Sequence, residues 1–458
     1  MQPIRIRSAK AAAELVEKRG LDHVKVGVFD LDGVLRGKFM GRDKFLGALA
    51  KGFGFCDVVL GWDTDDQLYD NVSLTGWHTG YPDAQVRIVP ETARSLPFEF
   101  DGKGLLFLAQ FTGEAATVCP RNVAARIVER AAVMGFEALA AFEYEFFLFD
   151  ETPHSVREKN YHGLRPMTPG SFGYSVLRTS VWSEFHGELL ATAEAMDMGL
   201  EGLHTETGPG VMEASIDKDT GLAAADKAAL FKTFSKVVAQ RHGLMATYMA
   251  KWSPDYPGQS GHIHMSLKSK RGGHPVFHDA KAEHGMSPAM RHFVGGQQRL
   301  MPELLAMIAP TVNSYTRLVP GFWAPTTASW GIDNRTCALR VVPGGPDALR
   351  VEYRIAAADA NPYLALAASL GAGLWGIEHE VEPTAPVVGN AYEAKLPAKL
   401  DLPRSLGEAA ARLRRSKAAA EIFGDTFVQH YAASREWEER EFRKAITDWE
   451  LKRYFEII

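Results

Sequence analysis

The sequence predicts an α+β protein with two domains, and three observations support this fold class. A chain of 458 residues is longer than one ordinary hydrophobic core sustains. Residues 24–111 alternate short apolar stretches with Gly, Pro and Asp turns, which is typical of strands. From residue 120 onward, long amphipathic patterns are separated by charged strands. We therefore expect a small mixed sheet domain over residues 1–115 and a larger domain of strands and helices over residues 116–458.

The first domain is predicted to begin with a helix over residues 9–19. Short alternating strands follow, with the sequences VKVGVFDLDG, VLRGKFMG, AQVRIVPET and GLLFLAQF. In the second domain, helices are predicted over residues 122–134, 183–197, 223–242 and 287–309. Charged strands are predicted at residues 143–150, 204–216 and 262–268, and twice between 338 and 355. Roughly the last sixty residues have the spacing of a helical tail.

One apolar stretch, residues 360–377, is close to the length of a membrane-spanning helix. Asn361, Pro362 and Ser369 dilute its hydrophobicity, so we expect a buried helix instead. The first twenty residues carry charge throughout and lack the apolar core of a signal peptide. The three cysteines form no CxxC pair, which argues against disulfides and favours the reducing cytosol. We therefore expect a cytoplasmic protein without a membrane partner.

The overall charge excludes one large class of partner. Lys and Arg number 51 and Asp and Glu number 56, which gives a formal net charge of -5. Such a chain has no broad positive field to follow a phosphate backbone, so nucleic acid is not expected as a partner. Any anion must be bound by a few arginines in one place.

Two glutamates on the strand at residues 143–150 are the first candidates for a functional site. Alternate residues of a strand share a face, so Glu143 and Glu145 lie together while Tyr144 and Phe146 face the other way. Two adjacent carboxylates repel each other unless a cation or a proton intervenes. Taken alone, the pair is also compatible with a solvent-facing edge strand.

The same pattern recurs on three further strands, which changes this interpretation. Glu206 and Glu213 flank a Thr-Gly-Pro-Gly turn that would bring them together in a hairpin. Two other strands carry His262, His264 and Ser266 on one face, and Arg350, Glu352 and Arg354 on one face. Buried charges are costly unless they are paired or bind a metal. Several carboxylates with one or two imidazoles suit Mg²⁺ or Mn²⁺ better than zinc.

Arginines form the complementary set. Five of them fall within forty residues, namely Arg317, Arg335, Arg340, Arg350 and Arg354. The guanidinium group binds phosphate or carboxylate through two parallel hydrogen bonds. Beside metal-type carboxylates, this set indicates phosphoryl transfer. The chain has no GxxxxGK[ST] motif, so a P-loop nucleotide fold is not expected.

A series of ordered motifs resembles a known family over essentially the whole chain. They are EYEFFLFD, HTETGPGVMEASI, SGHIHMSL, NSYTRLVPG, NRTCALRVVP, RVEYRIAAADANPYLALAA and the ending DTFVQHY with TDWELKRYFE. Through them the sequence resembles class I glutamine synthetases. The resemblance implies an N-terminal β-grasp domain and a catalytic domain built as an antiparallel β funnel with helices. It also implies a homo-oligomer, typically a dodecamer of two hexameric rings, in which a neighbour's N-terminal domain completes each site.

The resemblance also implies ligands, substrates and roles. Two or more Mg²⁺ or Mn²⁺ ions are expected per site, with ATP and L-glutamate as substrates. The ligands of the acceptor-side metal would be Glu145, Glu206 and Glu213. The ligands of the metal on the ATP phosphates would be Glu143, His262 and Glu352. Arg317, Arg354 and Gly258 would bind glutamate, Arg335 the transferring phosphoryl group, and His264, Ser266, Arg340 and Arg350 would bind ATP.

The acceptor pocket departs from the family pattern. YDNVSLTGW keeps the family's spacing from Asp70 to Trp77, so Asp70 would be the proton acceptor. The family's glutamate in the flap after VPG is replaced by Trp323, which removes a charge that suits ammonium and offers a face to an alkyl group. We therefore expect a small primary amine as acceptor; ammonia, with a shifted acidic residue, is the alternative. An asparagine expected before His262 is also missing, because Pro257 and Gly258 stand there.

Three other interpretations remain open. VFDLDGVL matches the DxDGxL signature of haloacid-dehalogenase-type phosphatases, with Asp30 as nucleophile and Asp32 as acid and base. The strand-like LRGKFM that follows predicts a hairpin, so we expect a coincidental match. A non-enzymatic oligomer on the same scaffold would have lost metal ligands, yet all six positions are filled. Tyr392 is a candidate for adenylylation, but its surroundings differ from the family's and we expect no modification.

Overall fold

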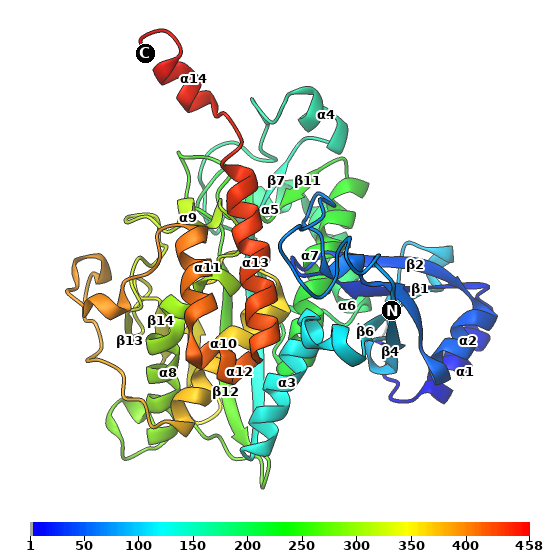
Figure 1. Ribbon diagram of the computed structural model, residues 1–458, viewed down its shortest axis with the longest axis horizontal. Coiled ribbons are helices and arrows are strands. Elements are labelled where there is room, and N and C mark those ends of the chain that lie inside the picture. Colours follow the sequence, from blue (N-terminus) through cyan, green and yellow to red (C-terminus); the bar gives the residue numbers. More distant parts are fainter. Residues whose placement is uncertain (1–2) are drawn as a thin grey trace.

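The computed structural model describes residues 3–458 and contains two separate sheets joined and covered by helices (Figure 1). The N-terminal sheet has the strand order β2-β1-β6-β4-β3, with β5 paired to β6. Its strands are β1 His23–Phe29, β2 Leu35–Gly41, β3 Phe53–Cys56, β4 Asp83–Ile88, β5 Arg94–Leu96 and β6 Gly104–Phe111. Strand β6 is buried throughout and runs parallel to β1, so the sheet is mixed, as predicted.

Two helices accompany this sheet, α1 (Ala9–Arg19) and α2 (Arg42–Lys51). Helix α1 confirms the prediction. Helix α2 corrects it, because only short strands were expected in this region. Phe45 and Ala48 are its buried residues, and their spacing of three is that of one helix face.

The turn between β1 and β2 excludes the phosphatase interpretation. The two strands form an antiparallel hairpin in which Phe29 lies opposite Leu35. Asp30 is buried in the turn, where its carboxylate accepts hydrogen bonds from the Val34 amide and the Arg36 Nε, both at 2.8 Å. A phosphatase nucleophile would instead sit at the end of a strand that leads into an α/β crossover. The aspartate here has a structural role in the hairpin.

The larger sheet has the order β13-β14-β15-β12-β7-β9-β8, with β10 and β11 also paired to β7. The strands are β7 Phe136–Phe149, β8 Leu200–Thr205, β9 Val211–Ile216, β10 Asp219–Thr220, β11 Met245–Thr247, β12 Gly261–Ser269, β13 Trp330–Ile332, β14 Leu339–Val342 and β15 Arg350–Tyr353. Every pairing is antiparallel except that of β13 with β14. Strand β7 starts seven residues before its predicted beginning. It is the central strand of the sheet, because it pairs with β9, β10, β11 and β12.

Long helices cover the apolar face of this sheet. They are α3 Pro120–Val133, α6 Ser183–Ala195, α7 Gly221–Arg241, α8 Pro288–Leu304 and α10 Pro362–Glu378. On β7, Phe142, Tyr144 and Phe146 point to this side and are buried. Phe146 packs edge-on against Phe231 of α7, with ring centroids 6.1 Å apart. The polar residues of β7 therefore face the opposite side, where the site lies.

Helix α10 is the apolar stretch that raised the question of a membrane. It is buried along nearly its whole length and crosses α8 at close range. A Cβ on Gly296 of α8 would lie 2.2 Å from the Ala372 carbonyl oxygen and 2.5 Å from the Gly376 Cα, so both helices need glycine at the crossing. No helix within residues 3–458 is long and apolar enough to span a bilayer.

The C-terminal helices confirm the predicted tail and hold the N-terminal sheet in place. They are α11 Leu406–Arg415, α12 Lys417–Phe423, α13 Asp425–Phe442 and α14 Asp448–Tyr454, and α14 projects from the rest of the chain (Figure 1). Arg435 of α13 is buried and pairs with Asp32 at 2.9 Å. Asn361, at the start of α10, donates to the carbonyl oxygens of Asp30 and Leu31 at 3.1 and 3.0 Å. The β1–β2 turn is thus fixed to the helices behind the larger sheet.

Candidate functional site

The polar face of the nine-stranded sheet lines a cavity of about 870 Å³. Every residue that the sequence nominated for the site lines this cavity except Asp70. They come from β7, β9, β12, β14 and β15, from the residue directly after β15, from the end of helix α9 (Ser314–Arg317), from the β8–β9 turn and from loops between residues 257 and 335. The alternation of side chains along each strand is what brings them to one surface.

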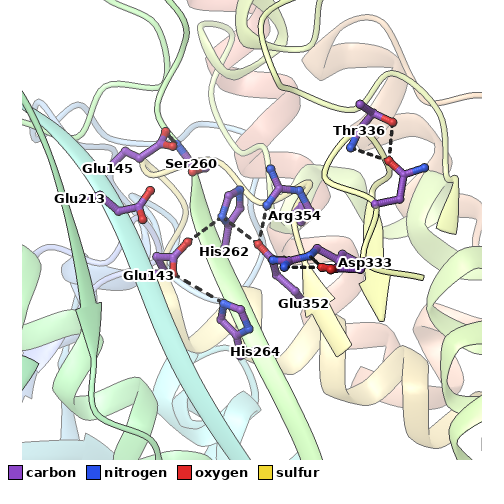
Figure 2. A network of polar contacts seen from close by, with 12 residues as sticks. Glu143, Glu145, Glu213, Ser260, His262, His264, Asp333, Thr336, Glu352 and Arg354 are labelled. Carbon is purple, nitrogen blue, oxygen red and sulfur yellow. Dashed lines mark hydrogen bonds and ion pairs between the residues drawn. The ribbon is translucent and has the colours of Figure 1, made fainter. Parts of the chain in front are cut away.

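One cluster is centred on His262, whose Nδ1 lies 3.2 Å from Glu143 Oε1 and 3.3 Å from Glu352 Oε1 (Figure 2). His264 Nε2 lies 3.7 Å from the other oxygen of Glu143. Strand register causes this grouping, because His262 lies opposite Glu143 and His264 lies opposite Glu352. Burial would raise the pKa of the Glu143 carboxyl, but its hydrogen bond with His262 and the nearby imidazole of His264 hold it below its usual range. The charges of His262 and Arg354 outweigh burial at Glu352 and lower its pKa to about 2.

A second cluster lies at the β8–β9 hairpin. Glu213 is opposite both Glu145 on β7 and His204 on β8, and His204 Nε2 is 3.1 Å from Glu213 Oε1. Ligand atoms of His204, Glu206 and Glu213 lie within 4.8 Å of one another. Burial, reinforced by the charges of Glu143 and Glu145, raises the pKa of Glu213 to about 7 despite its bond with His204. The same bond raises the pKa of His204 to about 9.

His204 is a site residue that the sequence reasoning missed. Its signal was present, because it lies two residues before Glu206 on one strand face. Its ring is stacked on Tyr174 with centroids 4.3 Å apart. Glu145 is also fixed, since its carboxylate accepts the Ser260 amide at 2.7 Å.

These two clusters fit divalent cations on the chemistry of their donors. Ligand atoms of Glu143, His264 and Glu352 also lie within 4.8 Å of one another. The donors are carboxylate oxygens with one or two imidazole nitrogens, the set that Mg²⁺ and Mn²⁺ accept. Carboxylates held this close also repel each other unless a cation or a proton intervenes. Each of the two clusters can therefore hold a divalent cation.

Four of the five arginines are held by contacts within the chain. Arg340 bridges Glu352 at 2.9 Å and Asp333 at 2.6 Å, and Arg350 Nε donates to His264 Nδ1 at 3.1 Å. Arg354 Nη1 donates to Glu352 Oε1 at 2.5 Å. The Nε of Arg354 is buried and has no acceptor among residues 3–458. Arg317 donates to the carbonyl oxygens of Ile355 and Arg354 at 2.9 and 3.2 Å. Burial lowers the pKa of Arg317 to about 10.

Arg335 differs from the other four arginines. Within the described residues, its side chain has no ion pair or hydrogen bond, although it lines the cavity. Its neighbours on both sides, Asn334 and Thr336, are bonded to each other and to the segment after residue 386. The turn is thus rigid while the guanidinium remains available to a ligand.

Asp333 is a second residue that the sequence reasoning missed. Its carboxylate holds Arg340, and its backbone has a φ of 48°, a left-handed conformation that costs free energy in a non-glycine residue. Gly258, which was predicted to bind glutamate, lines the cavity. A Cβ there would lie 2.6 Å from the Arg317 Cγ, so glycine is what lets this loop pass beside the arginine.

Residues 319–325 form a loop beside the cavity, which we call the flap. Phe322 and Trp323 line the cavity, and Trp323 is 60% exposed with a φ of 60°. Residues 318–332 contain no Asp or Glu. Lys251 Nζ lies 4.0 Å from the centre of the Phe322 ring. The flap therefore presents aromatic surface and no carboxylate to the cavity.

Asp70 lies outside the cavity. Its carboxylate pairs with Arg440 of α13 at 2.7 Å and is 62% exposed. Trp77, at the end of the same loop, is 78% exposed. The role predicted for Asp70 therefore stays a prediction.

Comparison with known proteins identifies the family. The model of the glutamine synthetase catalytic domain matches residues 117–454. The chain is 44% identical over 440 residues to type-1 glutamine synthetase 2 of Dictyostelium discoideum, covering 95% of this chain and 84% of that protein. It is 37% identical over 449 residues to glutamate–isopropylamine ligase of a Pseudomonas species, covering 97% of each. It is also 37% identical over 445 residues to gamma-glutamylethanolamide synthetase of Streptomyces coelicolor, covering 96% of this chain and 94% of that protein.

The structural comparison agrees. The solved complex of GmaS with ADP superimposes with a TM-score of 0.83 at 27% identity, over 97% of this chain and 99% of that one. The ordered motifs, the sheet that carries them and the matched family model all agree. The chain belongs to the glutamine synthetase family, whose members are ATP-dependent glutamate ligases.

Proposed function

We propose that the protein joins the γ-carboxylate of L-glutamate to a small primary amine through a γ-glutamyl phosphate, releasing ADP and phosphate. The observation that carries the choice of amine is the flap, which offers Phe322 and Trp323 and no carboxylate to the cavity. An indole face suits an alkyl group or a cation held over its ring, whereas free ammonium favours an anionic pocket. One relative named for isopropylamine as a substrate and another named for γ-glutamylethanolamide as a product support this choice.

The two chemical steps follow from the charges of the cavity. In the first, a γ-carboxylate oxygen bonds to the γ-phosphorus of ATP while the bond to the bridging oxygen breaks and ADP leaves. In the second, the amine nitrogen bonds to the acyl carbon, the carbon–oxygen bond breaks, phosphate leaves and the nitrogen loses a proton. The divalent cations, when bound, offset the charge on the phosphate oxygens. Glu143, Glu352 and His262 would hold one cation and Glu145, Glu206 and Glu213 another, with His204 and His264 beside them.

The arginines act at three places in this scheme. Arg335, whose guanidinium has no hydrogen bond or ion pair within residues 3–458, would bind the transferring phosphoryl group, where negative charge develops. Arg340 and Arg350 are held in place and would bind the ATP phosphates. The unpaired Nε of Arg354 supports a carboxylate ligand, because a buried donor without an acceptor is costly.

Trp323 provides the test of the acceptor. We expect ADP release with glutamate and Mg²⁺ to show a higher kcat/KM for at least one of methylamine, isopropylamine, ethanolamine and putrescine than for ammonium. Trp323→Glu should shift the ratio of kcat/KM values toward ammonium by about tenfold or more, since it restores a charge and removes the apolar face. Trp323→Phe keeps an aromatic face and is the matched control.

Ammonia is the second candidate, because the Dictyostelium discoideum relative is named a glutamine synthetase. If ammonium has the highest kcat/KM by a wide margin in the wild-type enzyme, the amine proposal is wrong and the chain is a glutamine synthetase in the strict sense.

The metal ligands can be tested without any turnover. Glu352→Gln keeps the size of the side chain but removes the charge between His262 and Arg354. We expect Mn²⁺ affinity, measured by isothermal titration calorimetry, to fall by about 10- to 100-fold at one class of site. Glu283→Gln, at an exposed position in a short 3₁₀ helix, is the control and should bind Mn²⁺ like the wild type. Equal affinity in both variants would contradict the assignment of Glu352.

We also propose that the N-terminal domain is a β-grasp domain and that the chain forms a homo-oligomer, a dodecamer of two hexameric rings. In this oligomer, Asp70 of one subunit would complete the active site of its neighbour. Asp70 and Trp77 are exposed and lie outside the chain's own cavity, which supports a role in another subunit. Helix α14 and the chain end beyond it also expose Trp449 and Phe455, at 60% and 84%. Apolar surface of this kind is typical of residues that a partner covers.

This arrangement predicts complementation between inactive chains. Asp70→Asn and Arg335→Ala chains are each expected to be inactive alone. Co-expressed, they should recover about a quarter of wild-type activity, because random mixing places an intact Asp70 beside an intact Arg335 in that fraction of sites. A mixed oligomer without recovered activity would refute shared sites.

A further inference from the structure

The flap holds Trp323 in a backbone conformation that needs support. Trp323 has a φ of 60° and Gly321 a φ of 85°, so two of the seven flap residues are left-handed. For a bulky residue this region is unfavourable, and it persists only where surrounding contacts fix the backbone. The indole itself is 60% exposed and supplies little packing. The support must therefore come from contacts that other flap residues make with the rest of the chain.

Tyr392 provides that support. Its hydroxyl donates to the Ala324 carbonyl oxygen at 3.1 Å, the residue directly after Trp323. Burial of the ring raises the pKa of this phenol, so the hydroxyl keeps its proton and remains a donor at neutral pH. The contact joins two segments 68 residues apart in the sequence.

The segment that carries Tyr392 is itself bonded to the turn of Arg335. Asn334 Nδ2 donates to the carbonyl oxygens of Val387 and Gly389 at 3.1 and 2.8 Å. Thr336 Oγ1 accepts the Ala391 amide at 3.0 Å. Both neighbours of Arg335 therefore bind the same stretch, residues 387–392, which we call the bridging segment.

We propose that Tyr392 is a positioning residue, which through the bridging segment fixes the flap and Trp323 relative to Arg335. The bridging segment contacts the turn of the phosphoryl arginine at one end and the flap at the other. The acceptor pocket is thereby aligned with the place where the acyl phosphate forms, so that the amine nitrogen meets the acyl carbon. The consequence for the acceptor rests on the proposed function; the contact between Tyr392 and the flap does not.

The effect of losing the hydroxyl should be graded, because Lys251 holds Phe322 independently. In Tyr392→Phe we expect the KM for the preferred acceptor to rise about three- to tenfold, the range of one hydrogen bond. The KM for ATP should stay within about 1.5-fold, because His264, Arg340 and Arg350 make no hydrogen bond or ion pair with the bridging segment within residues 3–458. Tyr161→Phe removes an exposed hydroxyl elsewhere and is the matched control.

Hydrogen–deuterium exchange gives a second readout that does not require turnover. Amides of residues 319–325 should exchange faster in Tyr392→Phe than in the wild type or in Tyr161→Phe, with no change in β12. Unchanged exchange in the flap overturns the proposal, as does an equal rise in the KM values for ATP and for the acceptor. If the wild type releases no ADP with any amine, the proposed acceptor fails, and the exchange in the flap alone decides the role of Tyr392.

Discussion

Arg335→Ala is expected to lower kcat for ADP release by about 10³-fold or more, the effect typical of an arginine that stabilises a transferring phosphoryl group. The KM for ATP should change much less, because Arg340 and Arg350 remain. The melting temperature should match the wild type, since the exposed Arg335 side chain makes no hydrogen bond or ion pair within residues 3–458 that its loss would break. Coupled spectrophotometry and a thermal scan measure the two quantities.

Two further variants sharpen this test. Arg335→Lys keeps the charge but loses the planar fork, so it should recover only part of the activity. Arg271→Ala removes an exposed arginine from a surface turn and should leave kcat unchanged. Activity of Arg335→Ala within tenfold of the wild type would contradict the role assigned to it. Such activity would mean that catalysis by this chain does not depend on Arg335.

Arg121→Met is expected to lower the free energy of unfolding by about 3–5 kcal/mol, the cost of leaving a buried charge without its partner. Arg121 of α3 binds Asp226 of α7 through two bonds of 2.9 Å, and both side chains are buried. It also donates to Gln110 of β6, while Tyr363 of α10 donates to Asp226 at 2.6 Å. One ion pair thus connects the N-terminal sheet with three helices of the larger unit.

A double variant separates this effect from loss of packing. Arg121→Met with Asp226→Leu removes both charges and should recover much of the lost stability, because no uncompensated charge remains. Urea unfolding at fixed protein concentration gives the comparison. If the double variant were less stable than Arg121→Met alone, the loss would be due to packing and not to the unpaired carboxylate.

The cavity could be predicted from the sequence because strands alternate their side chains. Glu143 and Glu145, or His262 and His264, must share a face in any extended conformation, so their grouping needs no knowledge of the fold. By contrast, knowledge of the fold was needed to predict which of these strands pair with each other. Asp333 reaches Arg340 only through a left-handed turn, and no periodic pattern marks such a residue.

The misplaced elements have a similar explanation. Strand β7 begins with FEALAA, whose alanines favour helix in isolation, and only pairing with β12 and β10 makes this stretch extended. Helix α2 was missed because its ten residues carry only two buried positions. Asp70 was nominated by the family's spacing to Trp77, and it lies outside the cavity of its own chain.

The strand order of the larger sheet has a consequence for how the enzyme is made. Glu143 and His262 are separated by 119 residues, and Glu145 and Ser260 by 115. Closing loops of this length is slow, because the entropy must be lost before the contact offers any compensation. Helices such as α7 and α10 depend on local bonds and can form early. During refolding, the helical signal should therefore return before Mn²⁺ binding does, and a chain halted partway would hold its helices without a metal site.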